Sequence, residues 1–174
     1  MNELGPYAII RSLLLKGIYM KTVLLSFSYE WYGYLKNGLK VYEHRKRFCS
    51  EPVLAYVYLG LPYRKIAAKM TLGKPVSIRD WKEKYKYDDK AIERIDDCLT
   101  RNNVAMPILS FQEIEDIDIR QIESVFPDFR VPISYLYLDN KPEIYEYIKR
   151  HEKNIGEPIT HSFDNISSNQ ICVY

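Results

Sequence analysis

Apolar and polar positions along the chain group into short segments typical of β-strands. Residues 22–27 (TVLLSF) are a short apolar run, and residues 53–60 (VLAYVYLG) are apolar on both faces, which predicts two buried strands. Residues 64–72 alternate between apolar and polar, which predicts a strand with one buried face. Two further strands are expected, at 105–117 and 131–138.

Segments whose apolar residues have helical spacing lie between these strands, at irregular intervals. Ser28 can cap a helix that runs to about Asn37, and Gly38 is the expected left-handed stop. Other helical segments are expected at residues 77–86, 88–101, 119–126 and 142–151. The resulting order, β-α-β-β-β-α-β-α-β-α, lacks regular crossover helices. It therefore predicts an α+β fold built on a small barrel rather than a doubly wound sheet.

Residues 40–48 (KVYEHRKRF) differ from the other predicted strands because polar side chains occupy both faces. Such a strand is typical of a sheet edge or of one wall of a wet cleft. The segment carries four Lys and Arg residues, with one carboxylate and one histidine among them. It could be a solvated edge, a nucleic-acid surface or part of an active site.

Composition limits these possibilities. A chain of 174 residues suits one domain, and 47% hydrophobic with 28% charged residues is typical of a globular protein. The formal net charge is only +2, so a function that depends on positive charge must reside in a local patch. Sixteen tyrosines favour surfaces that bind something flat. Candidates for base stacking are Trp31, Tyr42, Tyr56, Tyr58 and Tyr135.

Cysteine and histidine spacing gives no sign of a metal site. The three cysteines are far apart and odd in number, and the three histidines are scattered. We therefore expect no metal, no cofactor and no disulfide framework, in a reduced cytoplasmic setting. Residues 1–19 are too short and too charged to span a membrane. They are expected to be either an extension or a helix packed on a domain at 20–152, with a tail at 153–174.

A strand, a short helix and then the pattern G-x-K-x-x-E-x-R resemble the signature of the ASCH domains of the PUA-like superfamily. The pattern is formed here by Gly38, Lys40, Glu43 and Arg45. The resemblance covers roughly residues 20–150.

A second segment, FRVPISYLYL at 129–138, resembles the late part of that family, in which a proline, a serine and an aromatic residue lead into the closing strand. These residues are Pro132, Ser134 and Tyr135 here, and Ile133 stands where relatives often carry glutamine.

The resemblance implies a small PUA-like β-barrel with surrounding helices and a cleft beside the first helix. Members are mostly proposed to bind RNA or modified nucleotides, and some are reported as ribonucleases. Others hydrolyse acetylcytidine with a lysine, a threonine three positions later and a distant glutamate. Lys40 matches that lysine, but Glu43 occupies the threonine position, so we do not carry over this activity.

The expected ligand-binding residues are Lys40, Tyr42, Glu43, Arg45, Arg47, Ser134 and Tyr135. Glu43 and Arg45 are two apart on a strand and share a face, which fits either a surface ion pair or a guanidinium oriented for phosphate. Our main hypothesis is an RNA- or nucleotide-binding protein. The alternatives are a hydrolase of RNA or of a modified nucleoside that uses the same cleft, and a regulatory protein-interaction module. Catalytic residues and oligomeric state stay unassigned.

Overall fold

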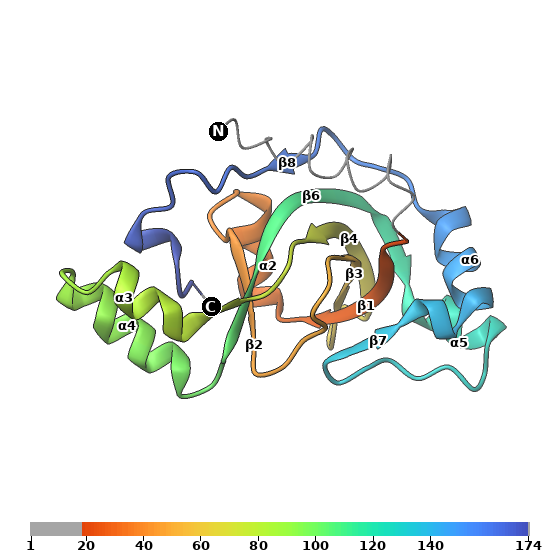
Figure 1. Cartoon of the computed structure of the whole chain (residues 1–174). Helices are drawn as coiled ribbons and strands as arrows, with labels where there is room; N and C mark the ends of the chain where they lie inside the picture. Colours follow the sequence, from red (N-terminus) through yellow and green to blue (C-terminus); the bar gives the residue numbers. More distant parts are fainter. Residues whose placement is uncertain (1–18, 174) are drawn as a thin grey trace.

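The computed structural model describes residues 19–173 and contains a strongly curled mixed sheet with helices around it (Figure 1). The main strands follow the spatial order β2-β6-β4-β3-β1-β7, and β5 and β8 pair with β6. Strands β1 and β3 are parallel, and the other pairs are antiparallel. The strands are β1 (Lys21–Phe27), β2 (Tyr42–Arg45), β3 (Val53–Leu59), β4 (Lys65–Leu72), β5 (Val76–Ser77), β6 (Val104–Asp118), β7 (Tyr135–Tyr137) and β8 (Ile159–Thr160).

Helices begin and end largely where the sequence predicts. Gly38 follows α2 with a φ of +67°, which is the left-handed stop that glycine permits. The Asp88 side chain accepts a hydrogen bond from the amide of Ala91 and caps α4. The α-helices are α2 (Tyr29–Lys36), α3 (Trp81–Lys84), α4 (Asp89–Leu99), α5 (Ile119–Val125) and α6 (Pro142–His151), and the 3-10 segments are η1 (Ile78–Asp80), η2 (Leu138–Asn140) and η3 (Ser168–Gln170). In the described part of the chain, none of them is both long and apolar enough to cross a membrane.

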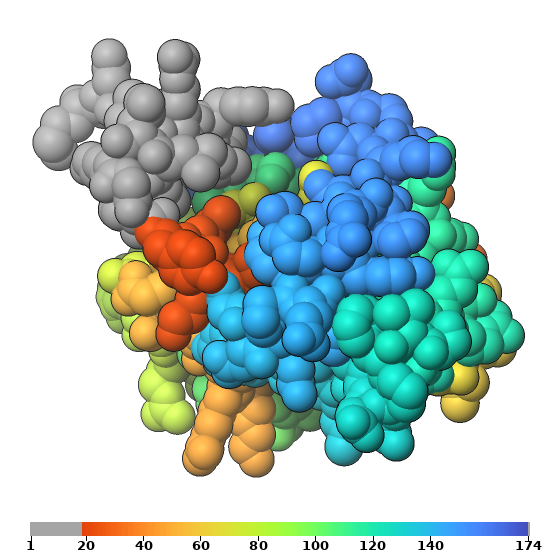
Figure 2. All heavy atoms as spheres, turned by 90° about the vertical axis from the view of Figure 1, so that its right-hand side faces the viewer, coloured from red at the N-terminus to blue at the C-terminus, as the bar shows by residue number. Residues whose placement is uncertain are grey.

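The core is divided by the sheet, because successive residues of a strand face opposite sides. On β1, Val23 and Leu25 pack inside the curl, whereas Leu24 packs on the outside. The outer cluster lies beneath α5 and α6, which form one continuous surface when the molecule is viewed from that side (Figure 2). A third cluster joins the segment around β2 to α3, α4 and the end of the chain.

The predicted α+β architecture is confirmed, in the form of a curled half-barrel. Two expected strands are shorter than predicted. Only Tyr135–Tyr137 of residues 131–138 pairs as a strand, and Tyr42–Arg45 is the paired part of residues 40–48. β2 lies at the end of the sheet, yet Tyr42, Glu43 and His44 are buried, because α3, α4 and the C-terminal segment (residues 153–173) cover it. The predicted extension at 1–19 lies outside the described residues apart from Tyr19.

The C-terminal segment, residues 153–173, runs over β6 and returns to the side of α3 and α4 (Figure 1). The amide of Ile155 donates to the carbonyl of Glu113, and β8 then pairs with β6 at Ser110 and Phe111. Beyond β8 the chain contributes Ile166, Ile171 and Cys172 to the third cluster. This segment therefore forms part of the buried structure around β2.

Replacing Ile171 by alanine tests that packing. Ile171 is 1% exposed, so Ile171→Ala should lower the free energy of unfolding by about 2–5 kcal/mol. Ile155→Ala, at an exposed position of the same segment, should change it by no more than about 0.5 kcal/mol. Urea denaturation measures both values. A small, equal loss in the two variants would show that the end of the chain does not pack as described.

Candidate functional site

Lys40, Glu43 and Arg45 meet in one buried ion-pair network. The Glu43 carboxylate accepts a hydrogen bond from Arg45 Nε at 2.8 Å through Oε1, and its Oε2 lies 3.6 Å from Lys40 Nζ. Lys40 is 2% exposed and Glu43 4% exposed. The amides of Leu39 and Lys40 both donate to the carbonyl of Tyr34, which turns the chain from α2 into β2 and brings Lys40 beside Glu43.

The two cations extend this network to other parts of the fold. Lys40 Nζ donates to the carbonyl of Val173 at 2.7 Å, near the end of the chain. Arg45 Nη2 donates to the carbonyl of Ser26 on β1, also at 2.7 Å. The amide of Ser26 in turn donates to the carbonyl of Ser134, just before β7. One carboxylate thus links β2 to the C-terminal segment and to β1.

Burial shapes the electrostatics of this region. It lowers the pKa of the Lys40 ammonium, and the Glu43 carboxylate opposes the shift. It also lowers the pKa of His44 well below the ordinary histidine value, and the charge on Lys40 adds to the shift. His44 is therefore neutral near pH 7, and the charges at the centre of the network belong to Lys40, Glu43 and Arg45.

The other predicted ligand residues lie in different surroundings. Tyr42 is buried, with its ring edge-to-face against Trp81 at 5.0 Å between centroids. Arg47 and Ser134 are exposed. Tyr135 is half-buried and its ring lies 4.7 Å from that of Phe48. The structure therefore brings Lys40, Glu43 and Arg45 together and connects Ser134 to them through Ser26, but it places Tyr42 in a separate apolar cluster.

An accessible cleft of about 510 Å³ lies beside the first turn of α2. Its walls are the start of that helix, the turn that joins β3 to β4, and Ile133. Ser26, whose carbonyl accepts from Arg45, also lines this cleft, so the buried network reaches its boundary. The lining residues are Ser26, Phe27, Ser28, Tyr29, Glu30, Gly60, Leu61, Pro62, Tyr63 and Ile133.

Two exposed tyrosines form an aromatic stack in the cleft. The rings of Tyr29 and Tyr63 lie 4.0 Å apart at an interplanar angle of 23°. Tyr29 is 51% exposed and Tyr63 38% exposed, so the stack presents ring surface to solvent. Tyr29 also lines a second hollow of about 310 Å³, on the side of Lys36 and Glu113, where side chains of both charges gather.

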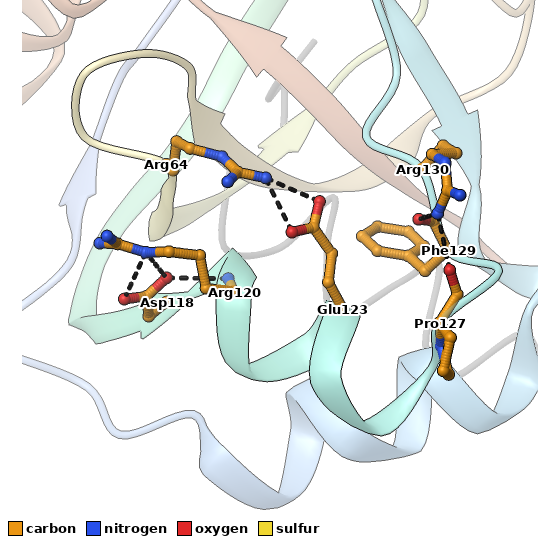
Figure 3. Close-up of polar contacts among 7 residues, drawn as sticks. All are labelled: Arg64, Asp118, Arg120, Glu123, Pro127, Phe129 and Arg130. Carbon is orange, nitrogen blue, oxygen red and sulfur yellow. Dashed lines mark hydrogen bonds and ion pairs between the residues drawn. The ribbon is translucent and has the colours of Figure 1, made fainter.

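Helix α5 fixes the turn that carries Tyr63. The carbonyl of Arg64 accepts from the amide of Ile119 at 2.9 Å, and Arg64 Nη2 contacts both carboxylate oxygens of Glu123 at 2.7 and 2.8 Å (Figure 3). Arg120 in the same region is bound to Asp118. Arg64 therefore supports the cleft wall, and carboxylates balance the charges of both arginines.

The sequence does not predict the aromatic residues of the cleft. Tyr56 and Tyr58, which are candidates for stacking from the sequence, are buried in the outer core cluster. Tyr63 lies in a turn, where no periodic pattern predicts which way a side chain faces. The available signal was the segment LPY directly after a buried strand, which marks a turn with an aromatic residue.

Similarity to known proteins is found in the structure and not in the sequence. The sequence matches no protein-family model, and no curated protein matches it significantly. The structure is similar to the crystal structure of ASCH from Zymomonas mobilis, with a TM-score of 0.59 at 17% identity, over 76% of this chain and 96% of that chain.

Two variants of the Zymomonas mobilis ASCH protein give the same result. A tyrosine-to-phenylalanine variant matches with a TM-score of 0.59 at 17% identity, over 76% of this chain and 99% of that one. A serine-to-alanine variant matches with a TM-score of 0.58 at 16% identity, over 76% and 97%. The curled sheet, its helices and these similarities show that the chain has an ASCH-like fold.

Proposed function

We propose that this protein binds RNA or a nucleotide in the cleft beside α2. The observation that carries the proposal is the exposed stack of Tyr29 and Tyr63. Bases stack on aromatic side chains regardless of their sequence, and two aligned rings offer a flat apolar surface to an unpaired base. Glu123 anchors the turn that carries Tyr63 through Arg64, so this turn loses little conformational entropy when a ligand binds.

The first turn of α2 suits a phosphate. Ser28 precedes the helix, and its hydroxyl caps none of the amides of α2. The amides at a helix N-terminus point away from the helix and carry partial positive charge, so they attract phosphate oxygens. Glu30 also lines the cleft, and its carboxylate can accept hydrogen bonds from the amino group of a base.

We infer that basic side chains of the β2 segment lie near the cleft, whose own lining contains Glu30 and no Lys or Arg. Phe48 packs on Tyr135, so the segment that carries Arg45 and Arg47 runs beside Ser134 and Ile133. Arg45 is partly buried, and Arg47 is exposed. We assign Arg47 and Ser134 to contacts with the ligand backbone.

Lys40 and Glu43 have a supporting part in this proposal. Both side chains are occupied within the buried network, and they hold Arg45 against Ser26 from behind the cleft. Tyr42 of β2 packs on Trp81, and Tyr135 packs on Phe48, which follows β2 in the chain. We place the protein in the cytoplasm, because three cysteines, odd in number and far apart in the sequence, suit a reducing compartment.

Tyr63→Ala, which removes the ring, should weaken the binding of single-stranded RNA by about 1–3 kcal/mol, or roughly 5- to 150-fold in the dissociation constant. Tyr63→Phe retains the aromatic face and should bind nearly as the unaltered protein does. Fluorescence anisotropy with a panel of labelled RNAs measures these values, and gel analysis of the same RNAs after incubation reports any cleavage. Tyr87→Ala is the control, because Tyr87 is 92% exposed and outside the cleft. Equal effects at Tyr63 and Tyr87 would contradict the proposed stacking.

Arg47→Gln, which removes the charge, should weaken the binding of all RNAs of the panel to a similar extent. It should also reduce the slope of log affinity against log salt concentration by about one. This result is expected because a phosphate contact releases a counterion and carries no sequence preference. Lys90→Gln provides a matched loss of charge on α4, which contributes no residue to the cleft. A salt slope that falls equally in both variants would indicate diffuse attraction rather than a contact by Arg47.

A further inference from the structure

His44, Cys98 and Cys172 form a buried cluster that the proposed RNA site does not use. One ring nitrogen of His44 and the sulfur atoms of Cys98 and Cys172 all lie within 4.8 Å of one another. The three side chains are buried, and they come from β2, α4 and the C-terminal segment respectively. Cys98 and Cys172 belong to the third core cluster, and the ring of His44 lies beside the rings of Tyr42 and Trp81 in that cluster.

We propose that these three residues bind a zinc ion, whose fourth position would be taken by water or another small ligand. Cysteine sulfur and histidine nitrogen are the donors that Zn²⁺ prefers, at bond lengths of about 2.3 and 2.0–2.1 Å respectively. Donors at such bond lengths around a tetrahedral ion are separated by roughly 3.5–4 Å. The separations within the cluster are limited to 4.8 Å, so at most a small contraction is needed. With no oxygen ligand among the three, the set disfavours Mg²⁺, Ca²⁺ and Mn²⁺.

The charges around the cluster are compatible with thiolate ligands. Zinc binds deprotonated cysteine, so its site must tolerate the negative charge of two sulfurs. Zn²⁺ and two thiolates sum to zero, which avoids a net charge in this buried region. The side chain of Asn102 donates to Cys98 Sγ at 3.8 Å.

The position of the cluster gives the ion a structural role. Cys172 directly precedes Val173, whose carbonyl accepts the hydrogen bond from Lys40. Zinc would therefore fasten the end of the chain to β2 and α4 and hold it over the Glu43 network. This inference is independent of the proposed RNA binding, because none of the three ligands lines the cleft beside α2.

Metal uptake by the full-length chain tests the proposal. The protein is reduced with a phosphine, stripped with a chelator, and incubated with Zn²⁺ before gel filtration and elemental analysis. We expect one zinc ion per chain, an increase in melting temperature, and slower amide hydrogen exchange in residues 161–173. Co²⁺ in place of Zn²⁺ should produce sulfur-to-cobalt charge-transfer absorption and the strong visible bands of a tetrahedral ion.

Three serine variants locate the ion. Cys98→Ser and Cys172→Ser should each lose the cobalt absorption and the thermal stabilisation. Cys49→Ser should retain both, because Cys49 is a half-exposed thiol outside the cluster. If a variant fails to fold, protection of Cys98 and Cys172 from alkylation by Zn²⁺ in the unaltered chain, mapped by mass spectrometry, gives the same information.

Several results would overturn the assignment. These are failure of the reduced protein to bind zinc, uptake that persists in both Cys98→Ser and Cys172→Ser, or uptake of Cu⁺ without uptake of Zn²⁺. Formation of a Cys98–Cys172 disulfide in air by a protein that binds no zinc when reduced would equally overturn it, and would assign the two thiols to a covalent link instead.

Discussion

The carboxylate of Glu43 lies between the Lys40 ammonium and the Arg45 guanidinium, with little access to water. A buried charge loses its hydration, so each member of such a group persists only while the others and their hydrogen-bond partners stay in place. The partners here are the carbonyl of Val173, near the end of the chain, and the carbonyl of Ser26 on β1. Closure of the C-terminal segment and the placement of β2 against β1 therefore both depend on one carboxylate.

That dependence explains how an open sheet supports a defined cleft. Within the described residues, β2 and β7 stand at opposite ends of the strand order and do not pair with each other. The hydrogen bond from Arg45 to Ser26 and the ring contact of Phe48 with Tyr135 join the two ends through side chains. The cleft lies beside this junction, so its β2 side is held by side-chain contacts, whereas Arg64 and Glu123 hold the side that carries Tyr63.

Local patterns in the sequence predicted much of this structure. The strand at 53–60, the helix that stops before Gly38 and the shared face of Glu43 and Arg45 all follow from spacing within a few residues. The depth of the network did not follow, because Lys40 and Val173 are 133 positions apart and only the folded chain brings them together. A strand with polar residues on both faces is predicted to be a solvent-exposed edge as long as the segment that covers it is not known.

The same reasoning accounts for what the sequence did not reveal about the sites. Tyr29 and Tyr63 meet because a turn and a helix start converge, and neither position has a periodic signal. His44, Cys98 and Cys172 come from three elements, so no ligand spacing exists along the chain. In contrast, the motif that resembles the ASCH signature lies within eight residues, so its pattern can be read directly from the sequence.

A double-mutant cycle at Lys40 and Glu43 tests the central role of the buried carboxylate most directly. Lys40→Met, Glu43→Gln and the double variant are compared with the unaltered protein by urea denaturation. Glu43→Gln alone should lower the free energy of unfolding by about 3–5 kcal/mol, because two cations then lack their counter-charge. The double variant should lose markedly less than the sum of the two single losses. Additive losses, or a loss below about 1 kcal/mol for Glu43→Gln, would contradict the account.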